Sequence, residues 1–465
     1  MTMRRRQLAV ALVPILVAVA CGGGGSSKKA ADTSGFTCDT TALAKTTAPV
    51  EITFWYSGLK ASNVDALKAL TDQYNAAQKK VHVTLQFQGS YDEGSDKYLT
   101  ALRGGALPNL VMLEETRVQL MVDSKSMVPA STCAKSDKYS FADYLPAVTK
   151  EFTVGDQLYP MPFNVSQPVL YYNKNDFKKA GLDPNKPPVS FEDVITDAKA
   201  IKASGAAKYG FAWEQQPWYV EQWFAKAGET IVDHGNGRDG RAQKSTLDSA
   251  TGKLVFGFVR SLFDQDLAIN VGRNEAGTDT LLAVGKGDAA MAIGTSAALG
   301  TIYDIQAAGQ FKDVEVGVAP LPGPAASNGG VQVGGGANWI VGKDKSDAEK
   351  AATWDYAKWL DEPAQQAYWH KHTGYIPLRR AAIDQPDVSS LWQAKPTFRV
   401  AYDQLSASKA AGGPAIGAYK EFRDAVRTAL ESMVLNKTPG DQALTQAQKD
   451  ADDAIKSYND RVGGG

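Results

Sequence analysis

The sequence predicts an α/β protein made of two unequal lobes, each assembled from segments that are not contiguous in the chain. One observation is an alternation of strand-like and helix-like periodicity from residue 50 to residue 113, which is typical of a doubly wound sheet. A similar alternation follows between residues 168 and 213. The 465 residues correspond to two or three domains at about 150 residues each, and no period of 20 to 50 residues indicates a repeat fold.

The elements follow in order along the chain. Strands are expected where β-branched and aromatic residues run together or alternate with polar ones, and helices where apolar residues recur every three or four positions. Strands are predicted at 50–56, 81–87, 110–113, 168–174, 209–213, 288–293 and 314–318. Helices are predicted at 64–77, 97–102, from 190 to a stop at Gly205, and at 275–285, 348–360, 363–371, 419–435 and 441–458. The Gly- and Pro-rich stretch 320–336 interrupts this pattern.

Composition excludes several classes of protein. The chain is 43% hydrophobic and 22% charged, and its 50 basic and 51 acidic residues leave a formal net charge of -1. This balance argues against nucleic acid as a partner. The only long apolar run lies at the N-terminus, which excludes a polytopic membrane protein.

The first twenty residues predict export. Arginines at positions 4–6 precede an apolar run at 8–20, and small residues lead into Cys21, which together describe a signal peptide over residues 1–20. A cysteine at that point resembles the bacterial lipobox, although Ala18 stands where a branched aliphatic residue is usual. We therefore expect lipid attachment at Cys21 and a flexible tether over 21–49, anchoring the protein to the outer face of the cell membrane. Plain secretion is the alternative.

The two other cysteines are expected to pair. In an oxidising compartment, Cys38 and Cys133 would form a disulfide that closes a loop of about 95 residues. Two buried free thiols are the alternative. Neither reading involves a metal, and the histidines His370 and His372 are spaced so that they point in different directions on a helix.

Motifs for catalysis are absent from the sequence, which lacks phosphate-binding, dinucleotide-binding, zinc-protease and nucleophile-elbow patterns. Glu114 and Glu115 follow a predicted strand end, where ligands of α/β sheets bind. A secreted glycoside hydrolase or esterase that uses Glu115 is therefore an alternative function. The aromatic cluster at Trp213, Trp218 and Trp223 instead suits a cleft for a sugar-like ligand, or else simple core packing.

Several segments resemble one family of proteins. They are 161–174 (MPFNVSQPVLYYNK), 176–184 (DFKKAGLDP), 89–91 (GSY), 104–108 (GGALP), 334–340 (GGGANWI) and 373–378 (TGYIPL). The chain closely resembles the extracytoplasmic solute-binding proteins of carbohydrate ABC importers, in particular the glycerol-3-phosphate and glycerophosphodiester binders. The similarity runs in one order along the chain, from about residue 50 to the C-terminus.

The resemblance implies a two-lobed periplasmic-binding-protein-like fold with a ligand cleft between the lobes and a hinge. We expect one lobe from 50–160 plus 275–325 and the other from 161–274 plus 326–465. The implied function is capture of a sugar or glycerol-phosphate-class solute and delivery to membrane permease subunits, by a monomer that is not an enzyme and needs no cofactor. Ligand-binding positions carried over from the family are Tyr91, Glu115, Ser166, Trp213, Trp218, Ser296, Gly335, Gly336 and Tyr375.

One position differs from the glycerol-phosphate binders in a way that affects the expected ligand. The glycerol-phosphate binders typically carry an arginine where Ala415 stands, and arginine is the natural partner of phosphate. Arg379 or Arg380 would have to supply this charge from another direction. Otherwise a neutral oligosaccharide or disaccharide is favoured over a phosphodiester, while a choline-bearing diester could use tryptophan and Glu115 as a cation-binding box.

Overall fold

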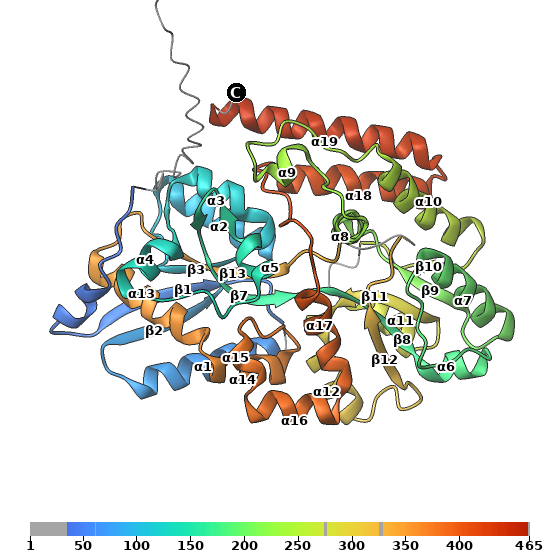
Figure 1. Cartoon of the computed structure of the whole chain (residues 1–465), viewed down its shortest axis with the longest axis horizontal. Helices are drawn as coiled ribbons and strands as arrows, with labels where there is room; N and C mark the ends of the chain where they lie inside the picture. The colour runs from blue at the N-terminus through green and yellow to red at the C-terminus, as the bar shows by residue number, and fades with distance from the viewer. Residues whose placement is uncertain (1–34, 61, 274–276, 325–328, 464–465) are drawn as a thin grey trace, which may run out of the picture. The chain divides into compact units, whose positions relative to one another are not determined.

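Two sheets organise the computed structural model, which describes residues 35–60, 62–273, 277–324 and 329–463 (Figure 1). Residues 32–465 form one structural unit. The predicted signal peptide, Cys21 and residues 22–34 of the predicted tether lie outside the described residues. The prediction of a flexible tether up to residue 49 is wrong for its second half, because Cys38 is buried in a disulfide and Thr40–Lys45 form a short 3-10 helix that packs on the first lobe. Within the ranges that the structure describes, no helix is long and apolar enough to cross a membrane.

The first sheet defines the first lobe and has the strand order β2-β1-β3-β13-β4, with β7 paired to β13. Its strands are β1 (Val50–Tyr56), β2 (Val81–Phe87), β3 (Leu110–Glu114), β4 (Met127–Val128), β7 (Met161–Ser166) and β13 (Gly334–Val341). β1 runs parallel to β2 and β3, whereas β13 is antiparallel to β3 and β7. The carboxyl end of β3 therefore lies beside the start of β13, because Glu114 pairs with Gly336.

The second sheet defines the second lobe and has the order β10-β9-β11-β8-β12. Its strands are β8 (Pro168–Asn173), β9 (Tyr209–Trp213), β10 (Ala268–Asn270), β11 (Ala289–Thr295) and β12 (Val316–Pro320). A two-stranded hairpin joins β5 (Thr153–Val154) to β6 (Gln157–Leu158). The predicted α/β class with two lobes is confirmed.

Helices surround both sheets (Figure 1). Those that follow or pack on first-sheet strands are α1 (Ser62–Ala77), α2 (Tyr91–Gly104), α3 (Val118–Ser124), α4 (Ala130–Asp137), α13 (Asp347–Leu360) and α14 (Pro363–Thr373). Those of the second lobe are α6 (Lys174–Lys179), α7 (Phe191–Ser204), α8 (Pro217–Ala227), α9 (Asp233–Gly237), α10 (Ala250–Asp264), α11 (Asp279–Gly285), α18 (Tyr419–Leu435) and α19 (Gly440–Val462). α12 (Leu299–Ala307) follows β11 of the second sheet but packs on α14 of the first lobe. The remaining short helices are α5 (Pro146–Glu151), α15 (Arg380–Ile383), α16 (Pro386–Ala394) and α17 (Val400–Ser406).

Helix ends follow local sequence signals. α2 begins at a capping box in which Ser90 accepts from the backbone of Glu93, and the Glu93 side chain accepts from the backbone of Ser90. The helix therefore starts six residues before the predicted 97–102. α7 begins with the same arrangement at Ser190 and ends at Gly205, which adopts the left-handed conformation that favours glycine.

The chain passes between the lobes at defined points. β7 ends at Ser166 in the first sheet, and β8 begins at Pro168 in the second, so that Gln167 alone connects them. The chain returns to the first sheet between β12 and β13, and passes again to the second lobe ahead of α18. Buried residues form one core in each lobe and a third cluster with members from both sheets.

Strand pairing differs from the predicted division of the lobes. β11 and β12, within the predicted first-lobe segment 275–325, pair in the second sheet. β13, within the predicted second-lobe segment 326–465, pairs in the first sheet, and α13 and α14 pack on the same lobe. Which sheet a strand joins depends on pairing partners distant in sequence, and these leave no local pattern.

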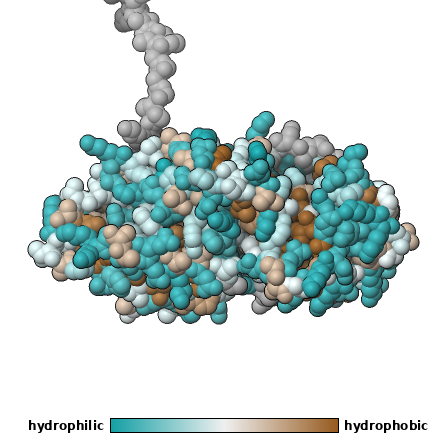
Figure 2. All heavy atoms as spheres, turned by 90° about the horizontal axis from the view of Figure 1, so that it is seen from below, coloured by the Kyte–Doolittle hydropathy of each residue, from teal (hydrophilic) through white to brown (hydrophobic). Residues whose placement is uncertain are grey.

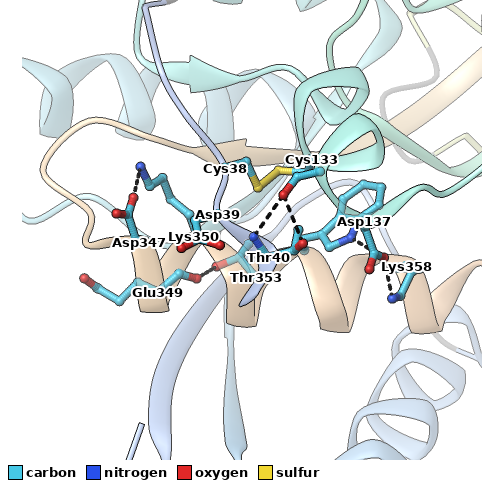
Figure 3. Close-up of a disulfide and its surroundings, with 12 residues drawn as sticks. Cys38, Asp39, Thr40, Cys133, Asp137, Asp347, Glu349, Lys350, Thr353 and Lys358 are labelled. Carbon is cyan, nitrogen blue, oxygen red and sulfur yellow. Dashed lines mark hydrogen bonds and ion pairs between the residues drawn. A yellow bond between two sulfur atoms is a disulfide. The ribbon is translucent and has the colours of Figure 1, made fainter. Parts of the chain in front are cut away.

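A disulfide joins Cys38 to Cys133, as predicted (Figure 3). It connects the segment ahead of β1 to α4, which follows β4. Near it, Lys358 on α13 donates to Asp137 at the end of α4 over 2.7 Å. These contacts secure the entry of the chain to the first lobe.

Candidate functional site

A cavity of about 390 Å³ lies between the two lobes. Both sheets contribute to its lining, as do the loops that follow their strands. Six of the predicted ligand-binding residues line it: Tyr91, Glu115, Ser166, Trp218, Gly335 and Tyr375. Its volume is in the range of small-molecule sites in proteins.

Glutamates and one arginine form the charged wall of the cavity. Glu114 ends β3, and Glu115 follows it in a short 3-10 helix. Arg423 on α18 donates to Glu114 through Nη1 and to Glu115 through Nη2, each over 3.2 Å. Its Nε and Nη2 also donate to the two carboxylate oxygens of Glu221 on α8, each over 2.8 Å. Every nitrogen of this guanidinium therefore already faces a carboxylate.

Burial sets the protonation of this cluster. Burial, followed by the charge of Glu114, raises the pKa of Glu115 well above the usual value, although Arg423 opposes the shift. Burial by itself would lower the pKa of Arg423, but Glu221 and Glu114 raise it well above the usual value. The arginine stays charged, and the site as a whole is more acidic than basic.

Tyrosines form the neighbouring wall. Tyr91 at the start of α2 lies over the backbone of Gly58, where a Cβ would come within 2.4 Å of its ring. Asn164 on β7 donates to the Tyr91 hydroxyl over 2.6 Å. Tyr375, in the loop after α14, stacks on Trp369 with ring planes 8° apart. Both phenols are thus held in place before any ligand binds.

Trp218 comes from the second lobe and reaches the first. It lies in the first turn of α8, and a Cβ on Gly334 would come within 2.3 Å of its ring. This close approach requires glycine at the start of β13. The indole Nε1 is buried without a hydrogen-bond partner among the described residues. Trp218 therefore offers a donor and a flat ring to a ligand.

Three predicted site residues lie behind the lining. Trp213 is fully buried in the second-lobe core, where it stacks on Trp223 and donates to Gln215 over 2.8 Å. The Ser296 hydroxyl accepts from the backbone of Gln167 over 3.2 Å, at the connection between the lobes. Gly336 is buried against the side chain of Asn164.

The positions considered as partners for a phosphate group lie outside the cavity lining. Ala415 is buried and hydrogen-bonded to Asn236. Arg379 pairs with Asp143 and Glu362, and Arg380 donates to the backbone of Ala142. None of these residues lines the cavity.

Arg423 was not among the predicted binding residues, although it closes the 414–423 segment that the resemblance covers. Its partners lie 202 to 309 residues away, so no local pattern indicates its role. Residues of α11 and α12 that line the cavity were missed as well. Among the described residues no cluster of His, Cys, Asp or Glu could hold a metal ion.

Comparisons with known proteins agree with this architecture. A family model described as bacterial extracellular solute-binding protein matches residues 69–399. The sn-glycerol-3-phosphate-binding periplasmic protein of Yersinia pseudotuberculosis is 28% identical over 432 residues, which cover 89% of this chain and 94% of the relative. An Escherichia coli protein of the same name is 28% identical over 430 residues, 90% of this chain and 95% of the relative.

Solved structures share the fold. UgpB of Mycobacterium tuberculosis, in complex with glycerophosphocholine, aligns with a TM-score of 0.74 at 20% identity, covering 88% of this chain and 100% of the other. The cyclic alpha-maltosyl-1,6-maltose binding protein of Arthrobacter globiformis aligns with a TM-score of 0.72 at 20% identity, with 88% and 100% coverage.

Proposed function

Because the chain belongs to the bacterial extracellular solute-binding proteins, we propose that it is the receptor of an ABC importer for a sugar or glycerophosphodiester-class solute. It captures the solute between its lobes and delivers it to membrane permease subunits. Relatives similar in sequence carry names of glycerol-phosphate binders, and similar structures include sugar binders. Binding, and not turnover, is the function that the site supports.

One observation supports this proposal above the others: the cavity takes its lining from both lobes. Trp218 and Tyr172 belong to the second lobe, whereas Tyr91 and Glu115 belong to the first. A ligand that contacts both sides favours the conformation in which they are close together, and this differential contact shifts the population. Closure about a hinge is the general mode of periplasmic binding proteins. The connection at Gln167, held by Ser296, is a candidate hinge point.

The charges favour a ligand without an exposed phosphomonoester. Arg423 already uses four of its five N–H groups on three surrounding carboxylates, so little of its hydrogen-bonding capacity is left for phosphate. A phosphate dianion would meet net negative charge there, whereas a sugar can donate hydroxyl groups to Glu115 and stack its C–H face on Trp218. A neutral sugar fits best. A zwitterionic diester with a quaternary ammonium is the second candidate, because the carboxylates and the aromatic rings favour a cation.

The hydrolase alternative gains no support from the comparisons. Glu115 Oε2 accepts from the backbone of Gly335 over 2.8 Å, and its Oε1 accepts from Arg423. The carboxylate is thus held by its neighbours, which suits a fixed binding group.

Calorimetric titration tests the proposal directly. Maltose, trehalose, glycerophosphocholine and glycerol-3-phosphate are titrated into the mature protein, and each mixture is then analysed by mass spectrometry. We expect stoichiometric binding of at least one of the first three and recovery of that compound unchanged. Turnover that is lost in Glu115→Gln would overturn the proposal in favour of the hydrolase.

The location at the membrane is also part of the proposal. We infer that Cys21 carries the lipid and that the following residues act as a tether, which keeps the receptor near its permease. Cys21→Ser should move the protein from the membrane to the soluble fraction of cells. Retention of the variant at the membrane would argue against lipid attachment.

A further inference from the structure

Besides the charged wall, the cavity has a region lined by apolar side chains of α11, of α12 and of the segment 311–316. We call this region the apolar channel and define it by Leu281, Leu282, Ile302, Ile305, Phe311 and Val316. Figure 2 shows brown, hydrophobic surface in a hollow to the right of the centre, on the side of the second sheet. A site for a sugar alone has no need of such a region.

Two helices present matching stripes to the channel. On α11, Leu281, Leu282 and Gly285 lie three and four residues apart and so share one face. On α12, Ile302 and Ile305 continue the stripe that Ala298 begins. At 1.5 Å rise per residue, the seven steps from Ala298 to Ile305 span about 10 Å. The apolar stripe on α12 is thus long enough to lie along an extended alkyl chain.

The two ends of the channel differ. At the far end, the Phe311 ring packs on Gly285, where a Cβ would stand 3.0 Å from it. At the near end, Thr295 and Ala297 connect the channel to the charged wall around Glu115. A ligand that spans both ends therefore meets charged groups at one end and apolar side chains at the other.

Polar atoms beside the channel are already bonded to the protein. The Tyr171 hydroxyl donates to the backbone of Thr295 over 2.7 Å, and the Tyr172 hydroxyl donates to that of Pro184 over 2.8 Å. Gln306 Nε2 donates to the Val314 carbonyl over 2.9 Å. A sugar ring placed here would find few partners for its hydroxyl groups, chiefly Thr301 and Gln306, and unpaired hydroxyl groups are costly where they are buried.

Polar atoms at the other end lack partners. Trp218 Nε1 and Asn63 Oδ1 both belong to residues that line the cavity, and both are buried without a hydrogen bond among the described residues. The polar end of the cavity thus has, close to its lining, a donor and an acceptor without partners in the described part of the chain, whereas the lining of the other end is mainly apolar. This separation is the mark of a site for a ligand with two chemically different parts.

We propose that the ligand is amphipathic, with a hydroxylated head at Trp218 and Glu115 and a single unbranched alkyl or acyl chain in the apolar channel. This inference rests on the proposed function and narrows its substrate class to a glycoside or glycerophosphodiester that bears one chain. Burial of the chain supplies affinity, and the head supplies specificity.

Titration of paired ligands tests the inference. Methyl and octyl maltoside share a head, as do glycerophosphocholine and a short-chain lysophosphatidylcholine, and all four are used below their critical micelle concentrations. Each methylene buried in the channel should tighten binding about fourfold, until the chain reaches Phe311. We expect octyl maltoside, the lysophosphatidylcholine or both to bind at least tenfold tighter than the matching compound without a chain. The pair that shows this difference tells whether the preferred head group is a sugar or a glycerophosphodiester.

A blocking variant separates the channel from the head site. Ile305→Trp fills the channel, so the chain-bearing ligand should no longer bind more tightly than the head alone. The affinity for the head alone should stay unchanged, which also shows that the variant is folded. Ile195→Trp, on a partly buried residue of the second-lobe core, is the matched control and should leave the advantage intact. Equal affinity for head and chain-bearing ligand in the unmodified protein would overturn the inference and leave the proposed function standing. Failure of all heads and chain-bearing ligands to bind would overturn the proposed function itself.

Discussion

Arg423 and Glu221 form a two-pronged ion pair inside the second lobe, with both nitrogen–oxygen distances at 2.8 Å. The same guanidinium links α18 and α8 to the carboxyl end of β3 in the first lobe. This arginine therefore organises the charged wall of the cavity and one contact between the lobes.

Replacement of Arg423 should destabilise the protein strongly. Arg423→Met leaves buried carboxylates uncompensated, and we expect a loss of about 3 to 5 kcal/mol in the free energy of unfolding, measured with urea. Arg427→Met, on the same helix, is the control, because its pair with Asp424 is partly exposed and should contribute about 1 kcal/mol or less. Similar losses in the two variants would show that the Arg423 cluster is not the buried network described above.

Removal of one carboxylate should change ligand selectivity. Glu114→Gln takes one negative charge away from Arg423, and we expect the affinity for glycerol-3-phosphate to rise about tenfold relative to maltose, by calorimetry. The control is Glu362→Gln, whose carboxylate pairs with Arg379 outside the cavity lining. An unchanged ratio would mean that the charge of the wall does not select against phosphate.

Two tryptophans of α8 should behave differently. Trp218→Ala removes a ring that faces the cavity, so ligand affinity should fall by about tenfold or more with little change in stability. Trp223→Ala empties a fully buried core position and should cost about 3 to 5 kcal/mol of stability. Affinity and urea unfolding are measured on both variants, and equal effects on both quantities would contradict the assigned roles.

Acid should destabilise the protein through His370. Its Nδ1 donates to the Tyr375 carbonyl over 2.7 Å, and its Nε2 accepts from Trp392 over 2.8 Å, which requires the neutral ring. Burial lowers the pKa of His370 from 6.5 to about 4. Between these values the unfolded chain binds a proton that the folded protein does not, so stability falls as the pH falls through this window.

The expected loss from His370 is about 3 kcal/mol between pH 7 and pH 4. Urea unfolding of the wild type and of His370→Gln at both pH values checks it, because protonation of the carboxylates affects the two proteins alike. The variant should lose less stability on acidification by that amount. Parallel losses would show that the ring takes up a proton in the folded state.

The disulfide should contribute to stability through the length of its loop. A closure of 95 residues restricts the unfolded chain, and the chain-entropy model gives about 4 to 5 kcal/mol as an upper value. The double variant Cys38→Ser, Cys133→Ser should lose up to this amount in urea unfolding, and reduction of the wild type should reproduce the loss. If the double variant and the oxidised wild type have the same free energy of unfolding, the disulfide does not contribute to stability.

Local patterns predicted seven of the thirteen strands and eight of the nineteen α-helices in the described part of the chain, but not the assembly of the sheets. β1, β2 and β9 match the predicted 50–56, 81–87 and 209–213, because each carries a strand pattern of its own. β13 was missed because it opens with three glycines and lies in a stretch that is otherwise typical of a loop. β7 was missed because all of its residues are buried, which removes the alternation that marks a strand.

The candidate site was likewise predicted only in part from the sequence. Glu115 could be predicted from its place after a strand, and Trp218 from the family resemblance. Trp213 was predicted in the same way but is fully buried in the core. Its burial depends on the packing of the whole lobe and not on local sequence. The role of Arg423 and the apolar channel depend on contacts between distant segments, so only the folded structure reveals them.

The disulfide also determines how a pulling force would travel through the molecule. Tension applied to the chain ahead of Cys38 passes through the sulfur–sulfur bond into α4 at Cys133. The polypeptide between the two cysteines, which contains β1 and α2, lies inside the closed loop, so the bridge prevents tension between its two ends from extending it. The tyrosine and glutamates that this stretch contributes to the cavity are thereby protected from being pulled apart along the chain.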